Sequence, residues 1–324
     1  MGSYEDLLKF FEARLEQQAF GHKPGELYAP IDYTVNLKGK RIRPILTLMA
    51  CELFGEDKEE AVSQAMAIEL FHNFTLIHDD IMDNAPIRRG KETVFKKWGE
   101  NIAILSGDTL FALAYQYAQQ ARVEILPKTL SVFSKTAIEV CEGQQYDLNY
   151  ENNNDVSVDE YIEMIRLKTA VLFGASLKIG ALVGGATVEE SDKLYDFGIN
   201  IGLGFQLKDD LLDAFGDEEV FGKKTGGDII TNKKTFLYLK AVEVADEKTR
   251  EELVSLYNTT DIPDDYKTAR VKKIFTQLHI DEAVNRKIDA YFEAGMKILE
   301  GIRIDEGNNQ ILIDIARRMI DREK

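Results

Sequence analysis

The chain has 324 residues, of which 44% are apolar, so it is long enough and apolar enough to bury a large core. Its formal net charge of −16 argues against a surface made for nucleic acid or anionic lipid. An anionic ligand would therefore need a local basic site or bound metal ions. The two cysteines, Cys51 and Cys141, provide neither a disulfide framework nor a zinc site.

No segment predicts export or stable insertion into a membrane. The first six residues lack the basic and apolar regions of a signal peptide. No apolar run approaches the length of roughly 18 residues that a membrane span needs. Free cysteines fit a reducing compartment, so we expect a cytoplasmic protein. Only six prolines are present, where average usage gives roughly 16, which favours long helices.

The first part of the chain predicts a helix, a loop and a basic turn. Apolar residues at helical spacing predict a helix over residues 4–18. Glycines and prolines predict a loop after it, at Gly21, Pro24, Gly25 and Pro30. The segment 39–44 then places Lys40, Arg41 and Arg43 directly before an apolar helical run. Three cations at a helix N-terminus predict an anion site, with a solvated basic patch as the alternative.

A helix without Pro or Gly is predicted over residues 59–83, and it carries the first of two aspartate clusters. Asp79, Asp80 and Asp83 have the spacing D-D-x-x-D near its C-terminal end. A helix turns about 100° per residue, so Asp79 and Asp83 share one face, one turn apart. Crowded carboxylates resist ionisation unless a cation compensates them. Mg²⁺ suits this task because it takes one or two carboxylates and completes its shell with water and phosphate.

Basic and imidazole side chains flank this first cluster. Arg88 and Arg89 lie in the loop beyond it, from which two guanidinium groups can bind phosphate oxygens. His72 lies about two turns before Asp79, near the same face, and is either a ligand or a core histidine. With Glu69 it also spells the Glu-x-x-His of di-iron bundles, but that site needs a second copy and the sequence has none.

Further helices are predicted over residues 102–121, 130–148 and 161–185. The last of these contains Lys168 and Thr169, followed by glycines and alanines that let helices pack closely. No strand-type alternation of any length is found. The charged, helix-forming segment from 241 to 324 contains nothing that indicates catalysis, and we expect it to serve packing and surface roles.

A helix over residues 197–215 carries a second D-D-x-x-D cluster, at Asp209, Asp210 and Asp213. Gln206 lies one turn earlier on the face of Asp209. A Gly- and Lys-rich loop at 222–228 and then Lys233 suggest phosphate binding, although a solvated turn is as good a reading of that loop alone. A single acidic cluster is usually a solvated face. Two all-Asp copies, each behind an apolar segment, favour divalent metals that carry a diphosphate.

Six ordered blocks of this sequence resemble the trans-isoprenyl diphosphate synthases, also called polyprenyl synthetases, over nearly the whole chain. They are G-K-R-x-R-P at 39–44, the first cluster with Arg88 and Arg89, Gly143–Gln144, Lys168–Thr169, F-Q-x-x-D-D-x-x-D at 205–213, and Gly222–Lys223. The resemblance implies an all-α fold, as one domain over residues 1–324, with a helical bundle around a central cavity. It also implies a homodimer.

The resemblance further implies that the chain condenses isopentenyl diphosphate with an allylic diphosphate by Mg²⁺-assisted ionisation. Three Mg²⁺ ions per active site would be held mainly by Asp79, Asp83 and Asp209, with Asp80, Asp210 and Asp213 acting directly or through water. The allylic diphosphate would also meet Arg88, Lys168, Lys223 and Lys233. The region where charge develops would be lined by Thr169 and Gln206. Isopentenyl diphosphate would be held by Lys40, Arg43, His72 and Arg89.

Product length is expected to depend on Phe71, Phe74 and Thr75, which the resemblance implies form the cavity floor. Periodicity alone would favour Thr75 over Phe74, because Thr75 lies nearer the face of Asp79. A large floor residue predicts a short product, geranylgeranyl or farnesyl diphosphate, of about 15 to 20 carbons. Three alternatives remain open: a longer-chain synthase, a terpene synthase and a non-catalytic regulatory subunit. The Asp-rich second cluster argues against a terpene synthase, and the intact charged positions argue against a regulatory subunit.

Overall fold

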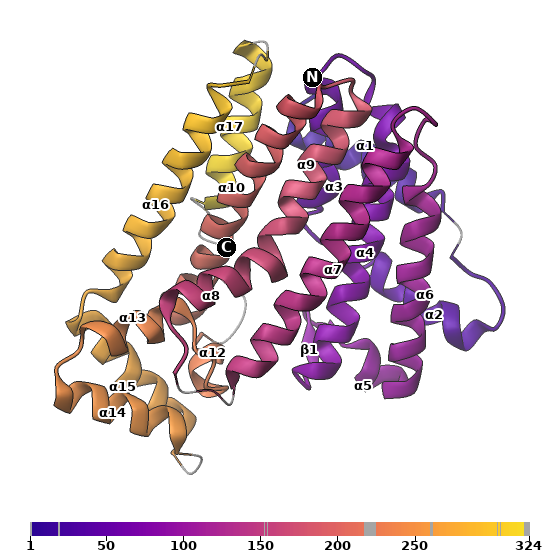
Figure 1. The fold of residues 1–324 in the computed structure, drawn as a ribbon. Coiled ribbons are helices and arrows are strands. Elements are labelled where there is room, and N and C mark those ends of the chain that lie inside the picture. Colours follow the sequence, from indigo (N-terminus) through magenta and orange to yellow (C-terminus); the bar gives the residue numbers. More distant parts are fainter. Residues whose placement is uncertain are drawn as a thin grey trace. The chain divides into compact units, whose positions relative to one another are not determined.

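The computed structural model describes residues 2–18, 20–151, 153, 155–216, 225–259, 262–302, 304 and 306–320. Within these ranges the regular structure is helical apart from one short hairpin, which confirms the predicted all-α class (Figure 1). No helix in the described part of the chain is both long and apolar enough to span a bilayer. Both cysteines are free, with Cys51 buried and Cys141 exposed.

The chain forms two compact units, each built from several segments. The first comprises Met1–Lys135, Ala175–Leu194 and Arg303–Ile311, and the second comprises Thr136–Gly174, Tyr195–Ile302 and Leu312–Lys324. Four helices contribute residues to both units: α7 (Leu126–Glu151), α9 (Val171–Val183), α10 (Val188–Phe215) and α17 (Glu306–Ile320).

The other elements of the first unit are α1 (Tyr4–Glu16), α2 (Gly25–Val35), α3 (Ile42–Leu53), the 3-10 turn η1 (Lys58–Ala61), α4 (Val62–Met82), β1 (Ile87–Arg88), β2 (Lys91–Glu92), α5 (Val94–Trp98) and α6 (Glu100–Ala118). Helix α1 begins as predicted, with Ser3 and Asp6 forming a reciprocal capping box. Helices α3 and α4 supply much of the core, and α4 packs along α6 (Figure 1).

The predicted loop around Pro30 is wrong, because residues 25–35 form α2 with Pro30 inside it. A proline in a helix removes one N–H and leaves the carbonyl four residues earlier without its helical partner. That carbonyl belongs to Glu26, in the exposed first turn, where water can satisfy it. The ring of Pro30 is itself buried, so packing outweighs the local preference for a turn.

The second unit adds α8 (Val158–Ile165), the π-helical turn η2 (Arg166–Ala170), α12 (Gly227–Ile230), α13 (Phe236–Val244), α14 (Glu247–Asn258), α15 (Asp264–Gln277) and α16 (Ile280–Leu299). The small residues predicted to allow close packing do so here. A Cβ at Gly198 would lie 2.7 Å from the Cα of Gly174, and one at Gly202 would lie 2.7 Å from the Cα of Ala170. Helix α10 therefore lies close against the segment that carries Lys168 and Thr169.

Candidate active site

The first aspartate cluster occupies the C-terminal turn of α4, as predicted. Asp80 is buried and Asp79 is half-buried. The helix ends at Met82 with Asp83 as its C-cap, and the next residue, Asn84, has a φ of +49°. Arg88 donates from Nε to Asp80 Oδ1 at 2.7 Å and from Nη2 to Asp79 Oδ2 at 3.2 Å. Burial raises the pKa of Asp80 to about 6, against the opposing effect of Arg88.

The hairpin after α4 presents two arginines in different directions. Strands β1 and β2 pair Arg88 with Lys91 across a two-residue turn, Arg89–Gly90, in which both φ angles are positive. Arg88 binds the aspartates, whereas Arg89 donates to the carbonyl of Leu37 at 3.4 Å. A Cβ at Gly39 would lie 2.7 Å from Arg89 Nη1, so the glycine lets the guanidinium pack against the backbone of the basic segment.

The four residues predicted to hold isopentenyl diphosphate gather around the start of α3. Arg43 Nη1 lies 3.2 Å from His72 Nε2, while Arg89 packs over Gly39 beside the exposed Lys40. Burial, reinforced by Arg43, lowers the pKa of His72 well below its usual range. His72 is therefore a neutral hydrogen-bonding group at neutral pH, and the three cations supply the positive charge.

Arg41 does not add to this charge, contrary to the three-cation anion site predicted for the segment. Its side chain is buried, forms an ion pair with Glu69, and donates to the carbonyls of Val35 at 2.6 Å and Leu37 at 2.9 Å. The same pairing explains the Glu-x-x-His pattern without a di-iron site, because the carboxylate of Glu69 binds Arg41 and the side-chain amide of Asn73.

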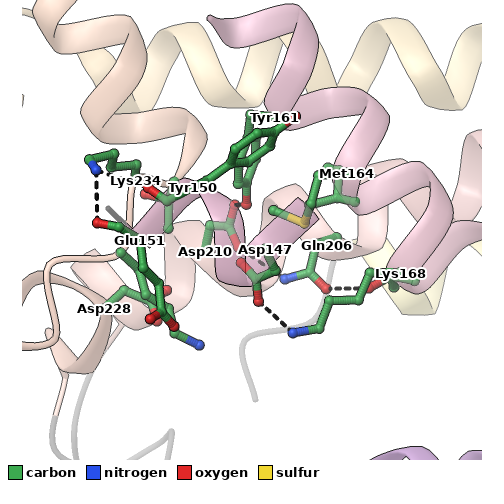
Figure 2. Close-up of a pocket in the computed structure, with 14 residues that line it drawn as sticks. Asp147, Tyr150, Glu151, Tyr161, Met164, Lys168, Gln206, Asp210, Asp228 and Lys234 are labelled. Atoms are coloured by element: carbon green, nitrogen blue, oxygen red, sulfur yellow. Dashed lines mark hydrogen bonds and ion pairs between the residues drawn. The ribbon is translucent and has the colours of Figure 1, made fainter. Parts of the chain in front are cut away.

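Asp210, of the second aspartate cluster, lines a cavity of about 110 Å³ within the second unit (Figure 2). Thr169 donates to Gln206 Oε1 at 3.1 Å, and Gln206 Nε2 donates to Asp210 Oδ1 at 3.0 Å. Tyr161 donates its hydroxyl to the other oxygen of Asp210. Burial, and next the charge of Asp228, raise the pKa of Asp210 to about 8. Five predicted residues thus line one cavity: Lys168, Thr169, Gln206, Asp210 and Lys233.

The sequence did not predict Asp147 and Asp228 as site residues, although both line this cavity. Asp147 Oδ2 accepts from Lys168 Nζ at 2.6 Å. Asp228 donates its backbone N–H to Asp213 Oδ2 at 2.9 Å, and burial together with Asp213 raises the pKa of Asp228. Both residues lie next to sequence features that already indicated the site, since Asp147 follows Gly143–Gln144 and Asp228 is the last residue of the Gly- and Lys-rich loop. Lys233 lines the same cavity, whereas Lys223 lies outside the described residues.

The segment that carries Lys168 and Thr169 departs from regular helix. Residues Arg166–Ala170 form a π-helical turn, a feature that often marks functional sites. A Cβ at Gly143 would lie 2.2 Å from the backbone nitrogen of Lys168. Gly143 therefore lets α7 approach the π turn closely enough for Asp147 to pair with Lys168.

The predicted floor residues divide into an aromatic cluster and a threonine. The rings of Phe71 and Phe74 lie 5.5 Å apart, and Phe74 lies 5.0 Å from Phe111 of α6. Phe71 also lies 5.6 Å from Phe133 of α7. The hydroxyl of Thr75 donates to the carbonyl of His72 at 2.8 Å. The structure thus joins the two phenylalanines of α4 in one cluster, and their role in product length stays a prediction.

The donor set of the two clusters fits Mg²⁺. In the part of the chain that the structure describes, no three acidic, histidine or cysteine side chains converge as a preformed metal cage. Mg²⁺ does not need one, because it binds through one or two carboxylates and keeps positions for water and phosphate. Burial raises the pKa values of Asp80, Asp210 and Asp213, which means that their negative charge lacks full compensation. Bound cations would supply it.

Comparison with known proteins decides the family, because a family model described as polyprenyl synthetase matches residues 24–278. The chain belongs to the polyprenyl synthetase family. This confirms the family that the six sequence blocks indicate. This chain is 40% identical over 304 residues to the geranylgeranyl diphosphate synthase of Methanosarcina mazei, and the match covers 93% of this chain and 91% of that one.

Two further relatives bear on fold and product. A geranylfarnesyl diphosphate synthase of Natronomonas pharaonis is 35% identical over 319 residues, covering 93% of this polyprenyl synthetase and 91% of the relative. A crystal structure of a geranylgeranyl pyrophosphate synthase matches over the whole of both chains, with a TM-score of 0.95 and 42% identity. The match confirms the isoprenoid synthase fold that the resemblance implied.

Proposed function

We propose that this polyprenyl synthetase is a geranylgeranyl diphosphate synthase, which extends allylic diphosphates with isopentenyl diphosphate to a product of about 20 carbons. One observation carries the proposal: a chain 40% identical to such a synthase keeps both aspartate clusters intact. The 35% identity to a geranylfarnesyl diphosphate synthase is the reason why product length is the finer part of the proposal. The aromatic pair Phe71 and Phe74 supports the shorter product, because bulky rings limit the space for a growing chain.

The basic group at the start of α3 would bind isopentenyl diphosphate. Lys40, Arg43 and Arg89 supply fixed charge, and the forked donors of an arginine match phosphate oxygens. Neutral His72 adds a hydrogen bond without adding charge. Holding the second substrate in place lets its double bond react with the allylic cation before water does.

The aspartates would hold Mg²⁺, with Asp79, Asp83 and Asp209 as the main ligands and Asp80, Asp210 and Asp213 in support. Mg²⁺ held by these residues would supply positive charge to the diphosphate that leaves when the allylic C–O bond breaks. Lys168, Arg88 and Lys233 add positive charge for the same anion. The apolar side chains of Met164 and Ile165 line the cavity and limit the access of water. No protein base is needed if the departing diphosphate accepts the final proton.

The test is to incubate the pure protein with Mg²⁺, isopentenyl diphosphate and each of three starters: dimethylallyl, geranyl and farnesyl diphosphate. Products that stop at geranylgeranyl diphosphate would support the whole proposal. Farnesyl or geranylfarnesyl products would keep the reaction and correct the chain length. Absence of product with every starter would refute the reaction and favour a terpene synthase or a regulatory subunit.

A further inference from the structure

We propose that Arg41 and Glu69 form a buried positioning pair that fixes the isopentenyl diphosphate site, without touching the ligand. The inference rests on the proposed function, since it concerns the basic group of Lys40, Arg43, His72 and Arg89. Arg41 belongs to the same short segment as two of these residues but turns the opposite way, into the core.

The pair is sealed from water, and both terminal nitrogens of Arg41 form hydrogen bonds. The side chains of Arg41 and Glu69 are 3% and 2% exposed. One terminal nitrogen of Arg41 meets Glu69, and the other donates to the carbonyls of Val35 and Leu37. Glu69 Oε1 also accepts from Asn73 Nδ2 at 3.1 Å. The guanidinium serves the carboxylate from one nitrogen and the two carbonyls from another, whereas lysine has a single donor nitrogen and methionine has none.

The backbone of Arg41 is unusual as well. Its φ is +49°, in the left-handed region that residues other than glycine seldom occupy. Its carbonyl accepts the N–H of Ile45 at 3.2 Å, so this single left-handed residue ends the loop and opens α3. Strained conformations of this kind persist where surrounding contacts enforce them, and they cluster at functional sites.

These contacts reach every member of the basic group. Lys40 directly precedes Arg41, and Arg43 lies two residues after it and contacts His72. Arg89 donates to the carbonyl of Leu37, the same carbonyl that Arg41 holds. The pair therefore sets the course of the segment that carries Lys40 and Arg43, to which Arg89 bonds at Leu37 and which contacts His72 through Arg43. Buried ion pairs are often no more stabilising than apolar pairs of similar size. Placement of the segment is thus a better reason for this pair than stability.

The test separates positioning from stability by using three variants: Arg41→Lys, Glu69→Met and the double variant Arg41→Met/Glu69→Met. Binding of isopentenyl diphosphate is measured by calorimetry without an allylic substrate, so that no turnover occurs. Thermal midpoints and the KM for farnesyl diphosphate are measured in parallel. Arg270→Met is the matched control, because Arg270 on α15 forms an ion pair with Glu252 on α14, in the second unit.

Glu69→Met alone should lower the midpoint, because it leaves a buried charge unpaired, and the double variant should recover much of the loss. The Kd for isopentenyl diphosphate should nevertheless stay about tenfold above the parent value in the double variant and in Arg41→Lys. Methionine makes none of the bonds of Arg41, and the single lysine nitrogen cannot occupy the positions of both terminal nitrogens. The KM for farnesyl diphosphate should change less than about twofold, and Arg270→Met should leave both constants unchanged.

Two outcomes would overturn the pair's role. A Kd that returns to the parent value as stability returns would make the pair purely structural, and so would a normal Kd in Arg41→Lys. If the double variant does not fold, Arg41→Lys alone decides, because it keeps the buried charges balanced. Failure of the proposed reaction is distinct, since it would appear as a parent protein that yields no prenyl product.

Discussion

At the residue scale, the second aspartate cluster shows that identical side chains in one motif have different surroundings. Both oxygens of Asp210 accept bonds from the protein, one from Tyr161 and one from Gln206. Asp209 is half-buried, and Asp213 accepts from the backbone N–H of Asp228. The hydrogen bonds to Asp210 form a chain that starts at Thr169. The spacing D-D-x-x-D does not predict these differences, because they depend largely on residues of other helices, Tyr161 of α8 and Asp228 of α12.

The raised pKa of Asp210 predicts how stability depends on pH in metal-free buffer. The pKa is about 8 in the folded protein and near 3.8 when unfolded, so the folded state binds more protons between these values. The free energy of unfolding should therefore fall as pH rises from about 4 to 8. Asp210→Asn should reduce this fall, because an amide does not ionise. The difference between the thermal midpoint of Asp210→Asn and that of the parent should increase by at least about 2 °C from pH 5 to pH 8. Parallel curves for the two proteins would contradict the assignment.

The metal assignment is tested by Asp79→Ala and Asp209→Ala, one from each cluster. Each should lower kcat by about 10²-fold or more, because the leaving diphosphate loses part of its compensation. The helical circular dichroism should stay unchanged. Asp289→Ala is the control, since Asp289 is an exposed aspartate on α16. Near-normal turnover in either cluster variant would remove that residue from the ligand set.

Product length should respond to Phe74→Ala. Removing this ring from the cluster with Phe71 and Phe111 opens space, so the main product should become longer than that of the parent. Product size with farnesyl diphosphate as starter is the measurement. Phe10→Ala on α1, also a half-buried phenylalanine, is the control and should leave the products unchanged. An unaltered product distribution in Phe74→Ala would place the floor at Phe71 or elsewhere.

At the element scale, the site in the second unit depends on helices that approach unusually closely. Gly143 on α7 faces the backbone of the π turn at Lys168. Gly198 and Gly202 on α10 face the chain just after it, from Ala170 to Gly174. The approach of α10 brings Gln206 to Thr169, and the approach of α7 brings Asp147 to Lys168. Small residues thus position the functional side chains that follow them along each helix.

Gly143→Ala tests this close approach. The added Cβ would meet the backbone nitrogen of Lys168 at 2.2 Å, so α7 or the π turn must move. We expect a loss of about 1–3 kcal/mol in the free energy of unfolding and a fall in kcat, because the pairing of Lys168 with Asp147 is disturbed. Gly21→Ala is the control, since a Cβ there meets no atom within 4 Å. A Gly143→Ala protein with normal stability and turnover would contradict the argument.

At the scale of the whole molecule, the chain has two compact units that share helices α7, α9, α10 and α17. The expectation that residues 1–324 act as one domain stays a prediction, as do the homodimer, the cytoplasmic location and the number of Mg²⁺ ions. Helix α6 exposes Ile104 and Leu105, which are 38% and 57% accessible. Apolar side chains of this kind are what a second copy of the chain would cover.

Light scattering tests the dimer directly. We expect a mass of about twice the 36.7 kDa of one chain. Leu105→Asp should shift the protein toward the single-chain mass, because burying an unpaired charge at an interface is costly. Val123→Asp, at a position 81% exposed outside α6, should not. A parent protein with the mass of one chain would refute the homodimer.

The sequence by itself determined the helical class, most helix positions, both aspartate clusters and the basic residues around α3. These follow from local rules, because helical periodicity and the D-D-x-x-D spacing depend on residues within a few turns of one another. Only the tertiary structure decided that Pro30 lies in a helix, that Arg41 turns inward to Glu69, and that Asp147 pairs with Lys168. The helix at Pro30 depends on packing of its buried ring. The two ion pairs join residues at least 21 positions apart in the sequence, so no local pattern predicts them.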